Sequence, residues 1–284
     1  MVGTIAPVLL RSPALRDFSD IRVRTALISD IHGNLAALEA VLADIASRGC
    51  DRKVCLGDIV GYGPDPRECV DLVAQHCEWS LMGNHDFGVL YEPTHFNAAA
   101  EKAAYWTRGQ LEADAGNDRE GAQRRWDFLG RLRVRVAMDE FLAVHGTPRR
   151  PINEYLFPED AQKDPRKLEQ IYDRAQPSRH IMVGHTHVPG VFVDEPDFVR
   201  PDDMTDATYA FTADERVIIN PGSVGQPRDL DPRASYAMLE SDATGRAVKV
   251  QFIRVPYDIE RTVGRIIAIP ELSNWLGERL REGR

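Results

Sequence analysis

Short apolar runs, each followed closely by a turn that contains glycine, set the pattern of this chain. Residues 24–29 form the first such run, and apolar positions then recur at helical spacing through residues 35–47. Gly49 ends this stretch, and a second short apolar run follows at residues 53–56. A strand, a helix and a strand joined by short connections predict a βαβ unit. We therefore expect a parallel strand pair in a layered α/β fold.

The same pattern predicts further elements along the chain. Proline is favoured at the first position of a helix, so we expect Pro66 to begin a helix that continues through residue 73. A helix at residues 259–267 is predicted to close the chain. The other apolar runs predict strands at residues 79–82, a hairpin at 134–138 and 141–144, a strand at 180–183, and a second, β-rich half with strands at 191–193, 208–211, 217–219, 235–239 and 247–253.

Several stretches depart from this pattern. Residues 87–133 are helical by composition and are expected to leave the sheet as an insert that roofs the site, and residues 149–176 form a second, irregular insert. Residues 1–23 are interpreted as an N-terminal arm, and residues 24–284 as a single domain. The acidic residues 194–206 are expected to form a solvated loop. The helices predicted inside the inserts span residues 98–111, 122–132 and 165–174.

Residues able to bind metal ions stand directly after five of the predicted strands. Asp30 and His32, two positions apart on extended chain, are expected to point the same way, with Gly33 allowing a turn and Asn34 capping the next helix. An Asp-x-His triplet is common, and a cap beside a surface histidine would explain it. That explanation does not account for ligand-type residues after five separate strands. The carboxyl ends of strands gather at one edge of a sheet, so these residues are expected to lie together. The residues are Asp30, His32, Asp58, Asn84, His85, His145, His185 and His187.

This set offers histidine nitrogens, aspartate carboxylates and one asparagine carbonyl, without cysteine. Such donors suit borderline divalent metals (Mn, Fe, Zn, Ni or Co) rather than a structural zinc site. Apart from His85, the candidates are more numerous than one metal ion needs. Two divalent metal ions that share a bridging carboxylate would use them all.

Charge and cysteine content narrow the classes of function. The 284 residues carry a formal net charge of −9 without a long basic run, which argues against general nucleic-acid binding. A small phosphorylated substrate stays compatible, because bound metal ions can supply a positive field. No apolar run approaches the ~20 residues of a membrane span, so we expect no membrane partner. Without a recognisable signal peptide we expect a cytoplasmic location and reduced thiols at Cys50, Cys55, Cys69 and Cys77.

Five motifs, taken in order, resemble those of the calcineurin-like metallophosphoesterases. They span residues 29–187 and are Asp30-x-His32, Gly57-Asp58, Gly83-Asn84-His85-Asp86, His145-Gly146 and Gly184-His185-x-His187. Residues 220–228, which begin Asn220-Pro221-Gly222, are similar to a segment of the small stand-alone bacterial and archaeal phosphodiesterase branch. The resemblance implies a four-layer α/β/β/α sandwich with helical inserts and a two-metal site.

The resemblance also implies a role for each motif residue. His85 would be the acid beside the leaving group, and a hydroxide that bridges the metal ions would attack phosphorus. The implied ligands are Asp30, His32 and His187 for the first ion, Asn84, His145 and His185 for the second, and Asp58 as the bridge between them.

The chain departs from the Ser/Thr protein phosphatases of this superfamily. Those enzymes follow the bridging aspartate with a second aspartate and an arginine, where this chain has Gly61 and Tyr62, and they place another arginine where it has Met82. We therefore expect phosphodiester hydrolysis of a small or nucleotide substrate. The alternatives are a phosphomonoesterase, a dinucleoside polyphosphatase or a Ser/Thr protein phosphatase at the same site, and a non-catalytic metal-binding scaffold.

Three further residues are candidates for substrate binding. Tyr62 could face the substrate from the loop after Asp58, or it could pack on the first insert. Asn220 and Arg228 could line the site, or they could fasten the glycine-rich turn in which they stand.

Overall fold

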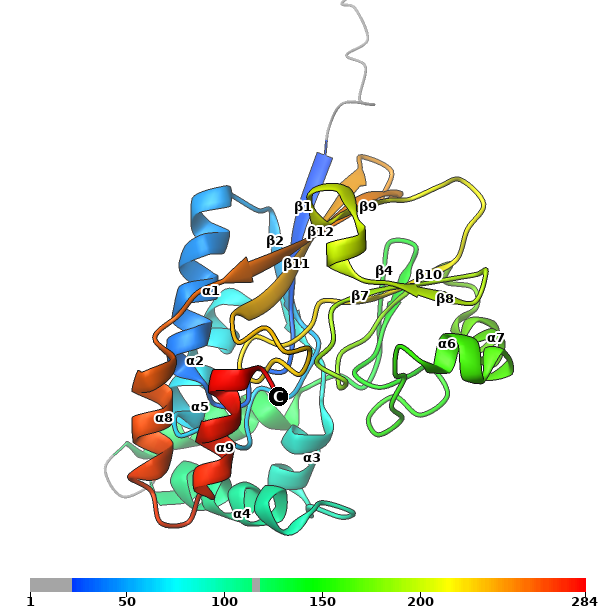
Figure 1. The fold of residues 1–284 in the computed structure, drawn as a ribbon. Coiled ribbons are helices and arrows are strands. Elements are labelled where there is room, and N and C mark those ends of the chain that lie inside the picture. Colours follow the sequence, from blue (N-terminus) through cyan, green and yellow to red (C-terminus); the bar gives the residue numbers. More distant parts are fainter. Residues whose placement is uncertain (1–21, 114–117) are drawn as a thin grey trace, which may run out of the picture.

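The computed structural model describes residues 22–113 and 118–284, so nearly all of the predicted N-terminal arm, residues 1–23, lies outside the described residues. Two six-stranded sheets lie between two outer sets of helices (Figure 1). The expected four-layer α/β/β/α architecture is confirmed.

The first sheet contains the predicted βαβ unit. Its strands β1 and β2 are parallel, with Leu27 opposite Val54, and β2 is parallel to β3. The other neighbouring pairs are antiparallel. The strand order is β3 (Trp79–Ser80), β2 (Arg52–Cys55), β1 (Arg22–Ile28), β11 (Ala234–Asp242), β12 (Ala247–Val255) and β9 (Thr208–Ala210).

The second sheet begins with the predicted hairpin. Strands β5, β6 and β10 are mutually parallel, and the outer pairs are antiparallel. The strand order is β4 (Val136–Met138), β5 (Phe141–Ala143), β6 (His180–Met182), β10 (Val217–Asn220), β7 (Gly190–Val193) and β8 (Asp197–Val199). The predicted second, β-rich half is therefore divided between the two sheets, because β9, β11 and β12 extend the first sheet.

Alternating side chains along the strands separate three buried layers. Ala26 and Ile28 of β1 face the helices of the first sheet, whereas Leu27 faces the second sheet. In the same way, Ile219 of β10 faces the first sheet and Ile218 faces the helices of the second. Both sheets are thus covered on both faces, and their strand ends come together at one edge of the sandwich.

The helices follow the predicted positions closely. α1 (Leu35–Arg48) is capped by the Asn34 side chain, which accepts the Ala37 amide at 3.2 Å, and it ends at Gly49, whose φ is 71°. Pro66 is the first residue of α2, as expected. The other helices are α2 (Pro66–His76), α3 (Asn84–Leu90), α4 (Ala98–Ala113), α5 (Arg119–Gly130), α6 (Asp160–Lys163), α7 (Pro165–Ala175), α8 (Ile259–Ile267) and α9 (Asn274–Glu278), with 3₁₀ turns at Pro201–Asp203, Thr205–Ala207 and Arg279–Glu282.

The structure corrects three predictions. The acidic residues 194–206 include β8 and two 3₁₀ turns, because Phe198 packs against Phe192 of β7 at a ring distance of 4.6 Å. The third strand is only two residues long. α8 is not the last helix, because α9 and a 3₁₀ turn follow it, and their Leu276 and Leu280 are buried beside it.

Within the described residues, no helix has the length and apolar character needed to cross a membrane.

Candidate metal centre

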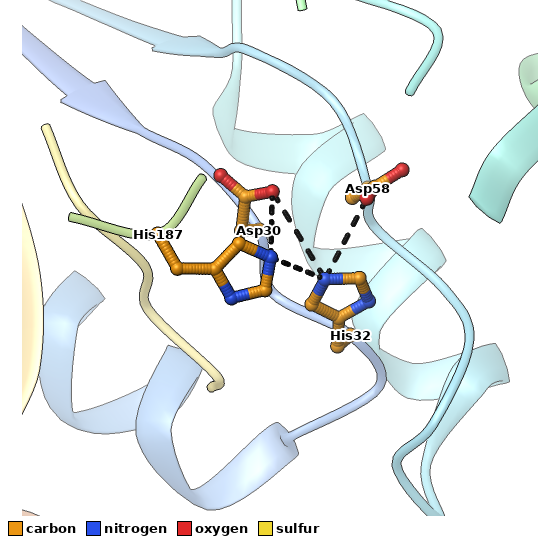
Figure 2. Close-up of side chains that lie close together, drawn as sticks. All are labelled: Asp30, His32, Asp58 and His187. Carbon is orange, nitrogen blue, oxygen red and sulfur yellow. Dashed lines mark hydrogen bonds and ion pairs between the residues drawn. The ribbon is translucent and has the colours of Figure 1, made fainter. Parts of the chain in front are cut away.

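Both sheets contribute to one polar cluster at the carboxyl ends of their strands. Asp30 and His32 follow β1 and Asp58 follows β2, while His145 follows β5 and His187 comes from the turn after β6. Figure 2 shows the side chains of Asp30, His32, Asp58 and His187 pointing toward one another. All of these side chains are buried. Because they follow strands of both sheets, the cluster lies at the junction of the two sheets.

The ligand atoms form two groups that share one carboxylate. Within each group the atoms lie within 4.8 Å of one another, a spacing that could hold a metal ion. Asp58 belongs to both: its Oδ2 lies 3.6 Å from His32 Nε2 and 3.4 Å from His145 Nε2. The first group is Asp30, His32, Asp58 and His187, and the second is Asp58, His145 and His185.

Ring nitrogens and carboxylate oxygens of the first group lie close to one another. His32 Nε2 lies 3.2 Å from His187 Nε2, and His187 Nε2 lies 3.3 Å from Asp30 Oδ1. Two histidine nitrogens and a carboxylate oxygen that converge in this way are a donor set for a divalent cation.

Left-handed backbone, and not extended chain, aims these side chains. The φ angles are 54° at Asp30, 49° at His32, 53° at Asp58, 69° at His185 and 63° at His187. Aspartate and histidine enter this region more readily than most residues, but it is sparsely populated. The prediction that Asp30 and His32 converge is correct, but its reason is wrong, because the strand ends before Asp30.

Backbone carbonyls fix the tautomer of three histidines. Val60 O lies 3.2 Å from His32 Nδ1, Leu56 O lies 2.8 Å from His145 Nδ1, and Gln226 O lies 2.6 Å from His187 Nδ1. Each carbonyl accepts the Nδ1 proton, so Nε2 is the ring atom that faces the cluster and is available to bind a metal ion. This is the usual way in which proteins orient a histidine ligand.

Both ring nitrogens of the second group, His145 Nε2 and His185 Nε2, are buried without a hydrogen-bond partner. Asn84 Oδ1, from the start of α3, is buried without one as well. An unpaired buried polar atom costs about 1–3 kcal/mol, and these three come from the residues that the resemblance assigned to the second ion. A cation bound between His145, His185 and Asp58 would satisfy both ring nitrogens, so these donors fit a second divalent metal ion.

Burial and mutual charge set the protonation states. Burial lowers the pKa of His185 to about 3. Burial also acts to lower the pKa of His145, but the Asp58 carboxylate beside it raises that pKa to about 9. Burial alone would raise the pKa of Asp58, yet the rings of His145 and His85 hold it well below the usual value. Asp58 therefore stays ionised and attracts a positive partner, which a metal ion would supply.

His85 lies beside this cluster with its ring enclosed by other rings. Its backbone amide donates to Asp58 Oδ1 at 2.8 Å, and ring centroids of Tyr62 and Phe96 lie 4.3 and 4.6 Å from its own. His85 Nδ1 is buried without a partner, and burial lowers the pKa of the ring to about 4. The ring thus faces the centre without belonging to either ligand group.

The three expected substrate contacts occupy different surroundings. Tyr62 is buried between His85 and His32, whose ring centroid lies 4.8 Å away. Asn220 donates to Gly184 O at 2.9 Å and to Thr186 Oγ1 at 2.8 Å, contacts that fasten the turn. Arg228 is half-buried: one terminal nitrogen donates to Gln226 Oε1 at 2.7 Å, and its Nε has no partner.

Sequence reasoning assigned no role to Asp86. Its carboxylate accepts four backbone amides, those of Asp58 (2.8 Å), Ile59 (2.9 Å), Val60 (3.2 Å) and Gly83 (3.0 Å). The signal was present, since an acid three residues after a glycine at a helix start is typical of a cap. Tyr155 was missed as well: it stacks on His185, and no motif marks it.

Comparisons with known proteins agree with this geometry. The profile of the calcineurin-like phosphoesterase superfamily domain matches residues 23–244. An uncharacterized protein of Methanocaldococcus jannaschii is 35% identical over 271 residues, which cover 93% of this chain and 100% of that protein. A metallophosphoesterase crystal structure from Sphaerobacter thermophilus is 38% identical with a TM-score of 0.76, covering 93% and 100% of the two chains. A hypothetical protein of Pyrococcus horikoshii shares the fold at 20% identity, with a TM-score of 0.68 and coverage of 92% and 99%.

Proposed function

The chain belongs to the calcineurin-like phosphoesterase superfamily, and we propose that it hydrolyses phosphodiesters with the help of two divalent metal ions. The observation that carries this proposal is the position of Asp58 Oδ2, which faces His32 Nε2 at 3.6 Å and His145 Nε2 at 3.4 Å. One carboxylate oxygen between two histidine nitrogens is the arrangement that a bridging ligand requires.

The residues of the two groups would hold the ions. When bound, two divalent ions lower the pKa of water toward ~7, supply a nucleophile at neutral pH and neutralise phosphate oxygens. Asp30, His32 and His187 would hold one ion, and Asp58 would contact both. The residues for the other ion would be Asn84, His145 and His185, which carry the unpaired buried atoms.

We assign His85 the transfer of a proton to the departing alkoxide. The hydrogen bond from its backbone amide to Asp58 Oδ1 holds this residue at the edge of the centre, and its ring centroid lies 4.8 Å from that of His32. A phosphate anion bound beside the ring raises its proton affinity, which offsets the effect of burial. Positioned proton transfer contributes roughly 10²–10⁴-fold for a poor leaving group.

The surroundings of the centre favour a diester over a monoester. A diester carries one negative charge less than a dianionic monoester, and its phosphate bears a second organic substituent. Phe96, which is partly exposed, presents a ring surface beside His85, and this surface suits an organic substituent better than a charged oxygen. Arg228 supplies a guanidinium with an unpaired Nε for the remaining phosphate oxygen.

A substrate panel with added Mn tests this proposal. The panel contains bis-p-nitrophenyl phosphate, p-nitrophenyl phosphate, diadenosine tetraphosphate and a phosphopeptide, and we expect the diester to have the highest kcat/KM. Monoester turnover far above diester turnover would overturn the choice of substrate. Metal analysis could instead find no bound ion, with no turnover after reconstitution with Mn, Fe, Zn, Ni or Co. That result would support the alternative of a non-catalytic protein.

The state of the cysteines supports a cytoplasmic location. All four, Cys50, Cys55, Cys69 and Cys77, are free thiols. A reducing compartment preserves such thiols, and fractionation of cells with a detected tag would test the assignment.

A further inference from the structure

A column of three aromatic rings leads outward from the second ligand group. Tyr155 stacks on His185 with a centroid distance of 3.7 Å and an interplanar angle of 20°. Phe157 stacks on Tyr155 at 5.2 Å and 3°. Tyr155 is 39% exposed and Phe157 is 42% exposed, so the column ends at the surface. Exposed rings held in parallel offer a face on which another flat ring can stack.

The exposed rings are fixed in place by the second insert. Leu156, between them, is buried in the apolar layer under α7, which turns its two neighbours outward. Lys167 donates to Tyr155 O at 2.8 Å, and Asp160 accepts the Phe157 amide at 2.9 Å. Rings that are already positioned lose little conformational entropy when a ligand binds.

The column forms one wall of a cavity of about 480 Å³, within the ~300–1,000 Å³ typical of small-molecule sites. Thr186 lies at the inner end between the ligand residues His185 and His187, so the cavity opens directly beside the metal centre. The lining also includes Val188, Arg200, Arg228 and Leu230.

Charged side chains of both signs line the cavity. Of its two acidic residues, Asp229 forms an ion pair with Arg254 through Oδ2, and Glu159 is exposed to solvent, which screens its charge. Arg228 keeps an unpaired Nε there. Arg200, exposed at the cavity wall, lies with its guanidinium carbon 6.0 Å from the Phe198 ring centroid. A ligand with a phosphate at one end and a flat ring at the other matches this order of groups.

We propose that this cavity binds the nucleoside arm of a nucleotide-type phosphodiester, with its base stacked on the Tyr155–Phe157 rings and its phosphate toward Arg228. The proposal rests on the proposed function, because it places the phosphate at the metal centre. It assigns specificity to two residues of the second insert that no motif marks.

Direct binding tests the proposal without relying on turnover. Isothermal titration calorimetry of the full chain, supplied with Mn, compares thymidine 5′-monophosphate with ribose 5-phosphate, which lacks a base. Stacking of a base on an aromatic side chain is worth about 1–3 kcal/mol, so we expect the nucleotide to bind about 5- to 150-fold more tightly. Phe157→Leu should remove most of this preference, because leucine keeps the apolar volume and loses the flat face.

Matched variants separate stacking from structural effects. Tyr155→Phe keeps the ring column and should keep the preference, whereas Tyr155→Leu should lose it. Tyr105→Leu removes a ring that is 47% exposed on α4, outside the cavity lining, and should leave the preference unchanged. Equal affinities for the two ligands in the wild type, or a preference that survives both leucine variants in the cavity, would overturn the proposal.

The proposed function is judged by a separate measurement. Turnover of bis-p-nitrophenyl phosphate by the wild type establishes the reaction class whatever the calorimetry gives. If turnover is present and the nucleotide preference is absent, only the cavity proposal fails. If the preference is present and turnover is absent with every metal tried, the hydrolytic function fails while the nucleoside site stands.

Discussion

The Asp86 carboxylate accepts the backbone amide of Asp58 at 2.8 Å, although the two residues come from different strand ends. The same carboxylate accepts three more amides, including that of Gly83, so it ties the loop after β2 to the start of α3. Gly83 approaches Asp58 so closely that a Cβ atom at position 83 would overlap the Asp58 side chain. Asp86 therefore positions Asp58, the proposed bridging carboxylate, and belongs to neither ligand group.

Asp86→Asn should destabilise the fold and weaken metal binding. One carboxylate oxygen becomes an amide NH₂, which cannot accept the two backbone amides that donate to it. Two unpaired buried donors would cost about 2–5 kcal/mol of the free energy of unfolding. Urea denaturation measures the loss, and calorimetry with Mn should show a lower affinity.

Asp164→Asn is the matched control for that variant. Asp164 caps α7 from an exposed position, where Oδ1 accepts the Lys167 amide at 3.2 Å. Asparagine caps helices as well as aspartate does, so stability should change by less than about 0.5 kcal/mol. If Asp86→Asn were as stable as this control, the role of Asp86 in holding the loop would be wrong.

The strand-end residues could be predicted from the sequence because the apolar runs fix where each strand stops. Asp30, Asp58 and His145 each follow such a run, and the structure brings them together. The sequence could not show that β1 and β5 belong to different sheets, since sheet membership depends on contacts distant in the chain. It also could not show the left-handed φ of Asp30, because long-range hydrogen bonds impose it, such as that from the Asp30 amide to Gly57 O at 3.0 Å.

The rest of the site depends on inserts that carry no periodic signal. Tyr155 and Phe157 stand in an irregular segment, and only the burial of Leu156 between them turns both rings outward. Apart from its local cap at Gly83, the Asp86 carboxylate accepts the backbone amides of residues 58, 59 and 60, which are distant in the chain and do not depend on side-chain type. Interactions of this kind leave no pattern in the amino-acid sequence.

Asp58→Asn should lower kcat/KM by more than about 100-fold and reduce the content of both metal ions. Partners that only support a metal ligand are worth about 10–100-fold, and a ligand shared by two ions should exceed that range. Metal analysis by mass spectrometry and kcat/KM on bis-p-nitrophenyl phosphate give the two readouts. Asp127→Asn, an exposed position on α5, is the control. Full metal content in Asp58→Asn would contradict a bridging role.

His85→Ala should leave the metal content intact and slow alkyl esters more than aryl esters. An alkoxide needs a proton to leave, so the loss on a dinucleotide should be about 10²–10⁴-fold. A p-nitrophenolate leaves without a proton, so bis-p-nitrophenyl phosphate should lose far less. Equal losses on the two substrates would mean that His85 acts on the phosphate and not on the leaving group.

His180 provides a test of pH-dependent stability away from the metal centre. Its ring is buried against Phe141 and Phe211, with both centroids 5.1 Å away, and its Nδ1 accepts the Val217 amide at 3.2 Å. Burial, with a smaller contribution from Arg179, outweighs the opposing charges of Glu215 and Asp194 and lowers the pKa of His180 from 6.5 to about 4. Glu140 Oε1 lies 3.5 Å from Nε2, the nitrogen that carries the proton of the neutral ring. The folded protein therefore holds this ring neutral at a pH where the unfolded chain protonates it.

The sign of the effect follows from where the proton binds. Above pH 6.5 the ring is neutral in both states, so His180 adds no pH dependence. As the pH falls from 6.5 to about 4, the unfolded chain gains a proton that the folded protein does not, and the free energy of unfolding falls by at most about 3 kcal/mol. His180→Asn keeps an acceptor for the Val217 amide and removes this titration. Urea denaturation at several pH values should therefore show a shallower decline in the variant than in the wild type, whatever its stability at pH 7.5. His76→Asn, at an exposed position on α2, should keep the wild-type slope, and a slope equal to the wild type in His180→Asn would refute the assignment.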